Sequence, residues 1–270
     1  MKTKALFFIT CILLATTNGF AQKNTIKGDG NIVTKEVSIS NYDEISYVGR
    51  MDIEYEQSDA APYLRIMVDE NILPYLDIKV KGKTLIIQPK DDKKFHKEFS
   101  HSLNLHPTVC EIKTNSRELK DISAVGGGEF RVKTPLKVDR LYISIAGSST
   151  INFEKLLEAR KVDFNVAGSG DINATQLKVD NLDCSVAGSG NIQLKGEAER
   201  GDMSVAGGGD ISAFGCVIRK AECSVAGGGN IKVFASEQLD ASIAGGGNIR
   251  YKGDPELSKS VIGGGSIRNN

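Results

Sequence analysis

Tryptophan is absent from this 270-residue chain, and aromatic residues make up only 6% of it. A binding site walled by large rings is therefore disfavoured, and the core has to come from small and branched side chains. No sign of charge predominates either, because 34 lysine and arginine residues balance 34 aspartate and glutamate residues. Without a basic excess, nucleic-acid binding has no electrostatic basis.

Long apolar runs are missing beyond the first 21 residues. Lys2 and Lys4 precede an apolar stretch at 5–15, and small residues follow it, which is typical of a signal peptide. No later run approaches the roughly 20 residues that a membrane-spanning helix needs. We therefore expect residues 1–21 to be removed on export to the periplasm, the outer surface or the extracellular space.

Glycine is plentiful, with 29 residues, and much of it falls in one repeated motif. The segment SVAGSGNIQL at 185–194 returns with small changes as SVAGGGDISA at 204–213 and as SVAGGGNIKV at 224–233. Successive units stand 18 to 21 residues apart. Their leading glycines are Gly126, Gly147, Gly168, Gly188, Gly207, Gly227, Gly245 and Gly263.

Apolar residues recur at fixed positions around each leading glycine. They occupy the positions four and two residues before it and four residues after it, as Cys184, Val186 and Ile192 do around Gly188. This alternation predicts a strand, a tight glycine turn and a second strand in every unit. The sequence therefore predicts an all-β fold with a parallel β-solenoid of about eight coils over 111–270, spaced about 4.8 Å apart.

The residue three positions after each leading glycine is polar, and most often Asp or Asn. Such residues suit the exit of a turn, and we expect them to stack in hydrogen-bonded ladders. A calcium-binding β-roll is disfavoured, because its glycine motif recurs every nine residues and supplies more carboxylates than this repeat does.

The first half of the chain lacks an obvious twenty-residue period. Residues 36–110 contain short alternating segments, and Lys81-Gly82-Lys83 separates two of them, which predicts a β-hairpin. We expect an antiparallel β unit that caps the solenoid, preceded by a linker at 22–35. The charged segment 90–97 is expected to be a loop.

These segments resemble a secreted bacterial family described as putative auto-transporter adhesin, head GIN domain. The matching residues are Tyr42–Ile45, Gly49, Met51–Ile53, Gln57, Glu70–Leu73, Ile78–Val80, Gly82–Leu85 and the AGSGDI and AGGGNI series. The resemblance covers about residues 36–250. It implies an all-β fold with stacked strands and a secreted or cell-surface setting, and it carries no catalytic residues to transfer.

The outward columns of the solenoid supply the candidate binding residues. Serine and alanine fill the positions three and one before the glycine, and acids recur five before it. The candidates are Ser185, Ala187, Ser204, Ser224, Asp183 and Asp202. Basic residues two positions before the acids, at Arg140, Lys161, Arg200 and Lys220, are expected to compensate them.

Histidine and cysteine offer little chemistry. His96, His101 and His106 lie close together, but in a strand over 99–106 the last two would point to opposite faces, which disfavours a metal site. The repeat serines have no nearby histidine to act as a base. We therefore predict no catalytic residue, no metal ligand and no cofactor.

Four cysteines remain after export. Cys184 and Cys223 share an inward column two coils apart, at about 9–10 Å, beyond the roughly 7 Å between Cα atoms that a disulfide spans. Buried thiols are expected, while the spacing leaves a disulfide between Cys216 and Cys223 open.

A secreted or periplasmic, non-enzymatic surface-binding or adhesion protein is the function that these features favour, with a glycan or a cell-surface protein as partner. The acid column keeps a polysaccharide-cleaving enzyme as an alternative. A self-associating scaffold is a further alternative. Lys259 and Asn269-Asn270 argue against it, because polar residues in the last coil resist pairing with another chain.

Overall fold

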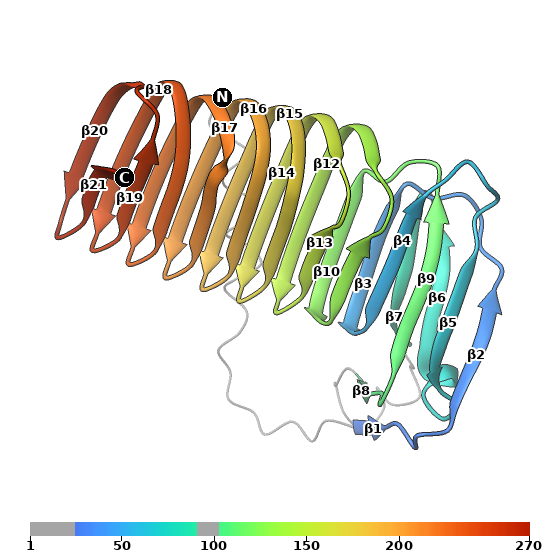
Figure 1. The fold of residues 1–270 in the computed structure, drawn as a ribbon. Helices are drawn as coiled ribbons and strands as arrows, with labels where there is room; N and C mark the ends of the chain where they lie inside the picture. The colour runs from blue at the N-terminus through green and yellow to red at the C-terminus, as the bar shows by residue number, and fades with distance from the viewer. Residues whose placement is uncertain (1–24, 91–102) are drawn as a thin grey trace.

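The computed structural model describes residues 25–90 and 103–270, and its strands stack into one long row of coils (Figure 1). The N-terminal strands are β1 (Thr25–Lys27), β2 (Ile32–Val37), β3 (Glu44–Arg50), β4 (Asp52–Gln57), β5 (Leu64–Asp69), β6 (Leu76–Lys81), β7 (Thr84–Pro89), β8 (Asn104–His106) and β9 (Cys110–Ser116), with a short 3-10 helix at Leu73–Tyr75. The predicted signal peptide and most of the predicted 90–97 loop lie outside the described residues.

The strands of the repeats follow in chain order. They are β10 (Asp121–Gly127), β11 (Glu129–Val132), β12 (Leu136–Gly147), β13 (Thr150–Phe153), β14 (Leu157–Gly168), β15 (Asp171–Gly188), β16 (Asn191–Gly207), β17 (Asp210–Gly227), β18 (Asn230–Gly245), β19 (Asn248–Lys252), β20 (Glu256–Ile262) and β21 (Ser266–Asn269). The long strands β15 to β18 each leave one glycine turn, bend around the coil and enter the next turn (Figure 1).

The predicted register is confirmed around the glycine turns, while between the turns it shifts at places such as Ala213 to Val217. Neighbouring coils pair in parallel, and Gly147, Gly168 and Gly188 follow one another at the turn. The apolar columns stack in the same way, with Val186 beside Val205. Each coil thus has two sheets, which we call the pre-turn sheet and the post-turn sheet, and their apolar side chains meet in the core.

Two glycines of each turn are required for different reasons. The leading Gly207 has a φ of +126°, a conformation that favours glycine. The third, Gly209, faces the carbonyl oxygen of Gly190, which a Cβ would approach to 2.4 Å. The middle Gly208 has no atom within 4 Å of an added Cβ, and serine fills this position in other coils, as at Ser189.

The interior is filled by the inward columns. Ile192, Ile211 and Ile231 are all at most 1% exposed, and the four described cysteines are buried and free. The structure therefore contains no disulfide between Cys216 and Cys223. Burial raises the pKa of the Cys216 thiol to about 12, so it packs as a neutral side chain.

The N-terminal unit differs in part from the sequence prediction. The antiparallel pairings are present, between β2 and β5, β5 and β9, and β6 and β7, and the last is the predicted hairpin. However, β3 and β4 pair in parallel with β10 and β11, with Gly49 beside Gly126, so the parallel stack begins inside the N-terminal unit. The segment predicted to be a linker, 22–35, contains β1 and much of β2.

The two ends of the stack are unlike each other. At the N-terminal end, β7 and β9 pair with β3 and β4 and cover the first coil. At the other end, β20 and β21 form the last coil of the row (Figure 1), and Ile262 is 73% exposed. In the portion of the chain that the structure describes, no helix is long and apolar enough to span a membrane.

Candidate binding groove on the solenoid

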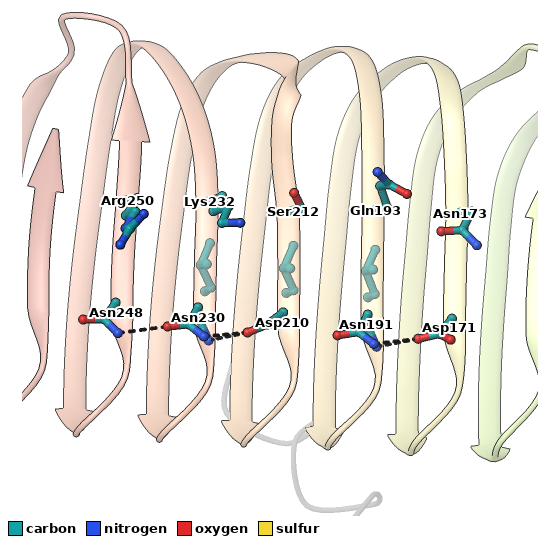
Figure 2. A pocket seen from close by; sticks show the side chains of 13 residues that line it. Asp171, Asn173, Asn191, Gln193, Asp210, Ser212, Asn230, Lys232, Asn248 and Arg250 are labelled. Atoms are coloured by element: carbon teal, nitrogen blue, oxygen red, sulfur yellow. Dashed lines mark hydrogen bonds between the residues drawn. The ribbon is translucent and has the colours of Figure 1, made fainter. Parts of the chain in front are cut away.

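A groove of about 540 Å³ runs across the outer face of the post-turn sheet, over the starts of β15 to β19. Two rows of polar side chains line it (Figure 2). The row nearer the glycine turns, which we call the amide ladder, consists of Asp171, Asn191, Asp210, Asn230 and Asn248. The second row, which we call the upper row, consists of Asn173, Gln193, Ser212, Lys232 and Arg250. The groove crosses five coils and is therefore built entirely by the repeat.

The amide ladder confirms the predicted stacking of polar turn residues. The Asn191 amide donates to the Asp171 carboxylate at 2.8 Å, and the Asn230 amide donates to Asp210 at the same distance. The Asn248 amide in turn donates to the Asn230 carbonyl oxygen at 2.9 Å. Both carboxylates of the groove are thus held by asparagines, and their positions are fixed.

The upper row is less constrained. Asn173 donates to the Asn152 carbonyl oxygen at 2.7 Å, whereas the described residues give Gln193, Lys232 and Arg250 no side-chain hydrogen bond. These three side chains are exposed. Amides, a hydroxyl and cations along one row can donate to and accept from a ligand laid across the coils.

The candidate residues from the sequence lie on the other sheet. Ser185, Ser204 and Ser224 stack in register on the pre-turn sheet, as predicted, and Asp183 stacks beside Asp202. The serines are half-buried, and Ala187 is exposed. The structure therefore brings all six candidates together on one face, but this face is separate from the groove.

The acids five positions before the leading glycines form a column that we call the acid column. A lysine neutralises it by ion pairs at one place. The Lys161 ammonium lies 3.0 Å from the Asp163 carboxylate and also contacts Asp183. Within the described ranges, Arg200 and Lys220 form no ion pair, so the expected compensation by these two is wrong. Burial, with Glu222 and Asp183 nearby, raises the pKa of Asp202.

The histidines form no site in the part of the chain that is described. His106 is exposed at the end of β8, and His96 and His101 lie outside the described residues. Over residues 25–90 and 103–270, no group of three histidine, cysteine or acidic side chains is arranged to hold a metal ion.

A family profile described as putative auto-transporter adhesin, head GIN domain, matches residues 41–174 and again 142–255. The chain belongs to this family. The matched ranges include the whole groove and the N-terminal strands β3 to β9. No curated protein matches the chain.

Three solved structures resemble this chain over most of its length. A "putative lipid binding protein" from Parabacteroides distasonis is 48% identical, covers 91% of this chain and 99% of its own, and gives a TM-score of 0.88. A "putative adhesin" from Parabacteroides merdae is 35% identical, covers 92% and 99%, and gives a TM-score of 0.84. A "putative adhesin" from Bacteroides fragilis is 26% identical, covers 91% and 100%, and gives a TM-score of 0.65.

The upper row is not among the candidate residues predicted from sequence, although the sequence carries a signal for it. Every repeat has a polar residue five positions after its leading glycine. These residues are Arg131, Asn152, Asn173, Gln193, Ser212, Lys232, Arg250 and Arg268. A position that is polar in all copies while its neighbours are apolar marks the outer face of the post-turn strand.

Proposed function

We propose that this protein is an exported, non-enzymatic surface-binding protein of the adhesin type, which holds glycan chains in the groove of the post-turn sheet. The observation that carries the proposal is the upper row, in which an exposed or half-buried polar side chain recurs once per coil across a groove. A glycan offers hydroxyl groups at regular intervals, and amides and hydroxyls bind them as both donors and acceptors. The adhesin names of related structures support a binding role.

A polar lining favours a glycan over an acyl chain, although one relative is named a lipid-binding protein. Burying an acyl chain gains most in an apolar pocket, and each polar group that it covers without a hydrogen bond costs free energy. The groove exposes Gln193, Lys232 and Arg250 along its upper row. The isoleucines that also line it, Ile192, Ile211 and Ile231, are at most 1% exposed.

Two matched substitutions test the site. Ser212→Tyr places a ring in the groove, and Ser204→Tyr places the same ring on the pre-turn sheet, where Ser204 is also half-buried. On a glycan array, we expect the unchanged protein and Ser204→Tyr to bind the same glycans and Ser212→Tyr to lose them. Loss of binding only in Ser204→Tyr would move the site to the face predicted from sequence, and an array without any binding would refute the proposal.

A polysaccharide-cleaving enzyme is the second candidate, and the acid column favours it. Burial raises the pKa of Asp163 and Asp202, and a carboxyl group that keeps its proton is what a general acid needs. The coil spacing of about 4.8 Å is near the roughly 5–5.5 Å between carboxyl groups in retaining glycosidases. A polysaccharide screen for new reducing ends tests it, since cleavage has to fall in Asp183→Asn and Asp202→Asn.

A further inference from the structure

Several charged side chains on the solenoid surface form ion pairs between neighbouring coils. The Arg160 guanidinium lies 2.8 Å from Asp139, and the Lys137 ammonium lies 2.9 Å from Glu158. Arg219 sits between acids of both neighbouring coils. Such pairs offset the repulsion that in-register stacking creates where like charges follow one another, as Asp183, Asp202 and Glu222 do.

A column of cations without such partners begins at the C-terminal end of the groove, where Lys232 and Arg250 line it, and continues to Arg268 one coil further on. Lys232 pairs in register with Arg250, and Arg250 pairs with Arg268, so three cations follow one another on successive coils. All three are exposed, and no acid among the described residues forms an ion pair with them. The groove carboxylates Asp171 and Asp210 are engaged by the amide ladder instead.

Three stacked cations repel one another. Their backbones lie about 4.8 Å apart, and like charges at such spacing repel one another even at the dielectric constant of water. Nothing in the fold requires this arrangement, because the same column holds Asn173, Gln193 and Ser212 in earlier coils. An anionic ligand would relieve the repulsion and gain from each of the three charges.

Aromatic side chains border this cationic column. Phe214 and Phe234 are half-buried on the outer face, two positions after Ser212 and Lys232. The Lys252 ammonium lies 4.6 Å from the centre of the Phe214 ring and adds a fourth cation. An apolar surface beside cations and amides suits a charged sugar, which has an apolar ring face, hydroxyl groups and an anionic group.

We propose that the column of Lys232, Arg250 and Arg268 makes the groove specific for an anionic polysaccharide, one that carries a carboxylate or sulfate on successive sugars. This inference rests on the proposed glycan-binding function and specifies its ligand class. The polymer lies along the solenoid axis, its anionic groups face the cationic column, and the hydroxyls contact Asn230 and Asn248 of the amide ladder. Binding therefore weakens as salt is added, because exposed charges are screened.

The test compares two triple variants with the same change in charge. One is Lys232→Gln, Arg250→Gln and Arg268→Gln, and the control is Lys137→Gln, Arg160→Gln and Arg219→Gln, whose cations are already ion-paired. Binding is measured to polygalacturonate, to neutral dextran and to phosphatidylglycerol vesicles. We expect the first variant to lose affinity for polygalacturonate by about tenfold, or about 1.4 kcal/mol, and the control to keep it.

Each other outcome overturns the inference in a distinct way. Equal binding of dextran and polygalacturonate, or equal loss in both variants, would leave the glycan-binding function standing without its anion specificity. Binding to the vesicles alone, lost in the first variant, would identify a lipid headgroup as the anion. Melting temperatures separate binding from folding, since removing stacked cations is expected to preserve or raise the stability of the first variant.

Discussion

At the scale of single residues, the third glycine of a turn leaves little room for a side chain. A Cβ on Gly209 would lie 2.4 Å from the Gly190 carbonyl oxygen and 2.6 Å from a methyl group of Val186. Both neighbours belong to the coil beneath and are fixed by the stack. One turn has a serine, Ser149, at this third position. The turn of the preceding coil differs too, because its third residue, Gly128, has a φ of +94°.

We predict that Gly209→Ala destabilises the fold by about 1–3 kcal/mol, the usual cost of overpacking a filled interior. Gly208→Ala is the matched control, because its Cβ would meet no atom within 4 Å. Urea unfolding of both variants measures the difference. Equal stabilities would show that the turns can separate enough to accept a methyl group.

Asp69 is the buried charge that fixes the N-terminal loops. Its carboxylate accepts hydrogen bonds from the Thr108 backbone N–H at 2.7 Å, the Thr108 hydroxyl at 2.6 Å and the Gly30 N–H at 2.9 Å. Burial alone would raise the pKa of Asp69, but the hydrogen bonds outweigh it and lower the pKa to about 2. The folded state therefore holds the ionised form.

We predict that Asp69→Asn lowers the free energy of unfolding by about 1–3 kcal/mol at pH 7, since the amide cannot accept all of these hydrogen bonds. The unfolded carboxyl has a pKa of about 3.9. The contribution of Asp69 is therefore complete above about pH 4 and is lost as the pH falls towards 2. Urea unfolding from pH 2 to 7 measures this, and the exposed Asp59→Asn is the control. If the difference in unfolding free energy between Asp69→Asn and the unchanged protein stayed constant with pH, the lowered pKa of Asp69 would be contradicted.

At the scale of elements, the amide ladder ties the post-turn strands together. Asn230 donates its side-chain amide and its backbone N–H to Asp210, at 2.8 Å and 3.0 Å. An alternation of Asp and Asn keeps donors opposite acceptors. Two carboxylates in succession would lose the donor and repel each other.

We predict that Asn230→Asp destabilises the protein by about 1 kcal/mol at pH 7, the size of one lost hydrogen bond or one exposed repulsion at this spacing. The effect should vanish near pH 3, because this lies below the usual pKa of about 3.9 for a free aspartic acid and protonation of the introduced carboxyl group ends the repulsion. Asp210→Asn is the control and should be nearly neutral, because its carbonyl oxygen still accepts from Asn230. Thermal unfolding at both pH values distinguishes the two variants.

At the scale of the whole molecule, the coils form a row with one covered end and one open end (Figure 1). In the last coil, Lys259 stands beside Ala241 in a column that is buried in earlier coils. The lysine places a charge where another chain would have to dock. It therefore opposes extension of the row by a second molecule.

We predict that Lys259→Val promotes self-association that grows with protein concentration. Lys178→Val is the control, since Lys178 is exposed on an internal coil whose edges are already paired. Light scattering over a range of concentrations measures the mass. A monodisperse Lys259→Val protein would show that the remaining polar groups protect the edge without the lysine.

The parallel stack extends further than the repeat count indicates. Ile45, Tyr47 and Ile53 stand four before, two before and four after Gly49, which are the apolar positions of the later repeats. The spacing of the repeats does not predict this unit, because residues 58–120 separate it from the next one in the sequence. The Tyr47 and Tyr55 rings lie 6.2 Å and 6.3 Å from Phe130, and they join the N-terminal unit to the first repeat.

The sequence by itself determined the coil, because every repeat carries its own strand, turn and strand pattern and its own glycine. Register followed as well, since a shift of one residue would turn the apolar columns outward. Only the tertiary structure decided how β2 to β9 close one end, because those pairings join segments far apart in the chain. It also decided which outward columns meet in a groove and which charges stay unpaired, since both depend on what lies beside each side chain one coil away.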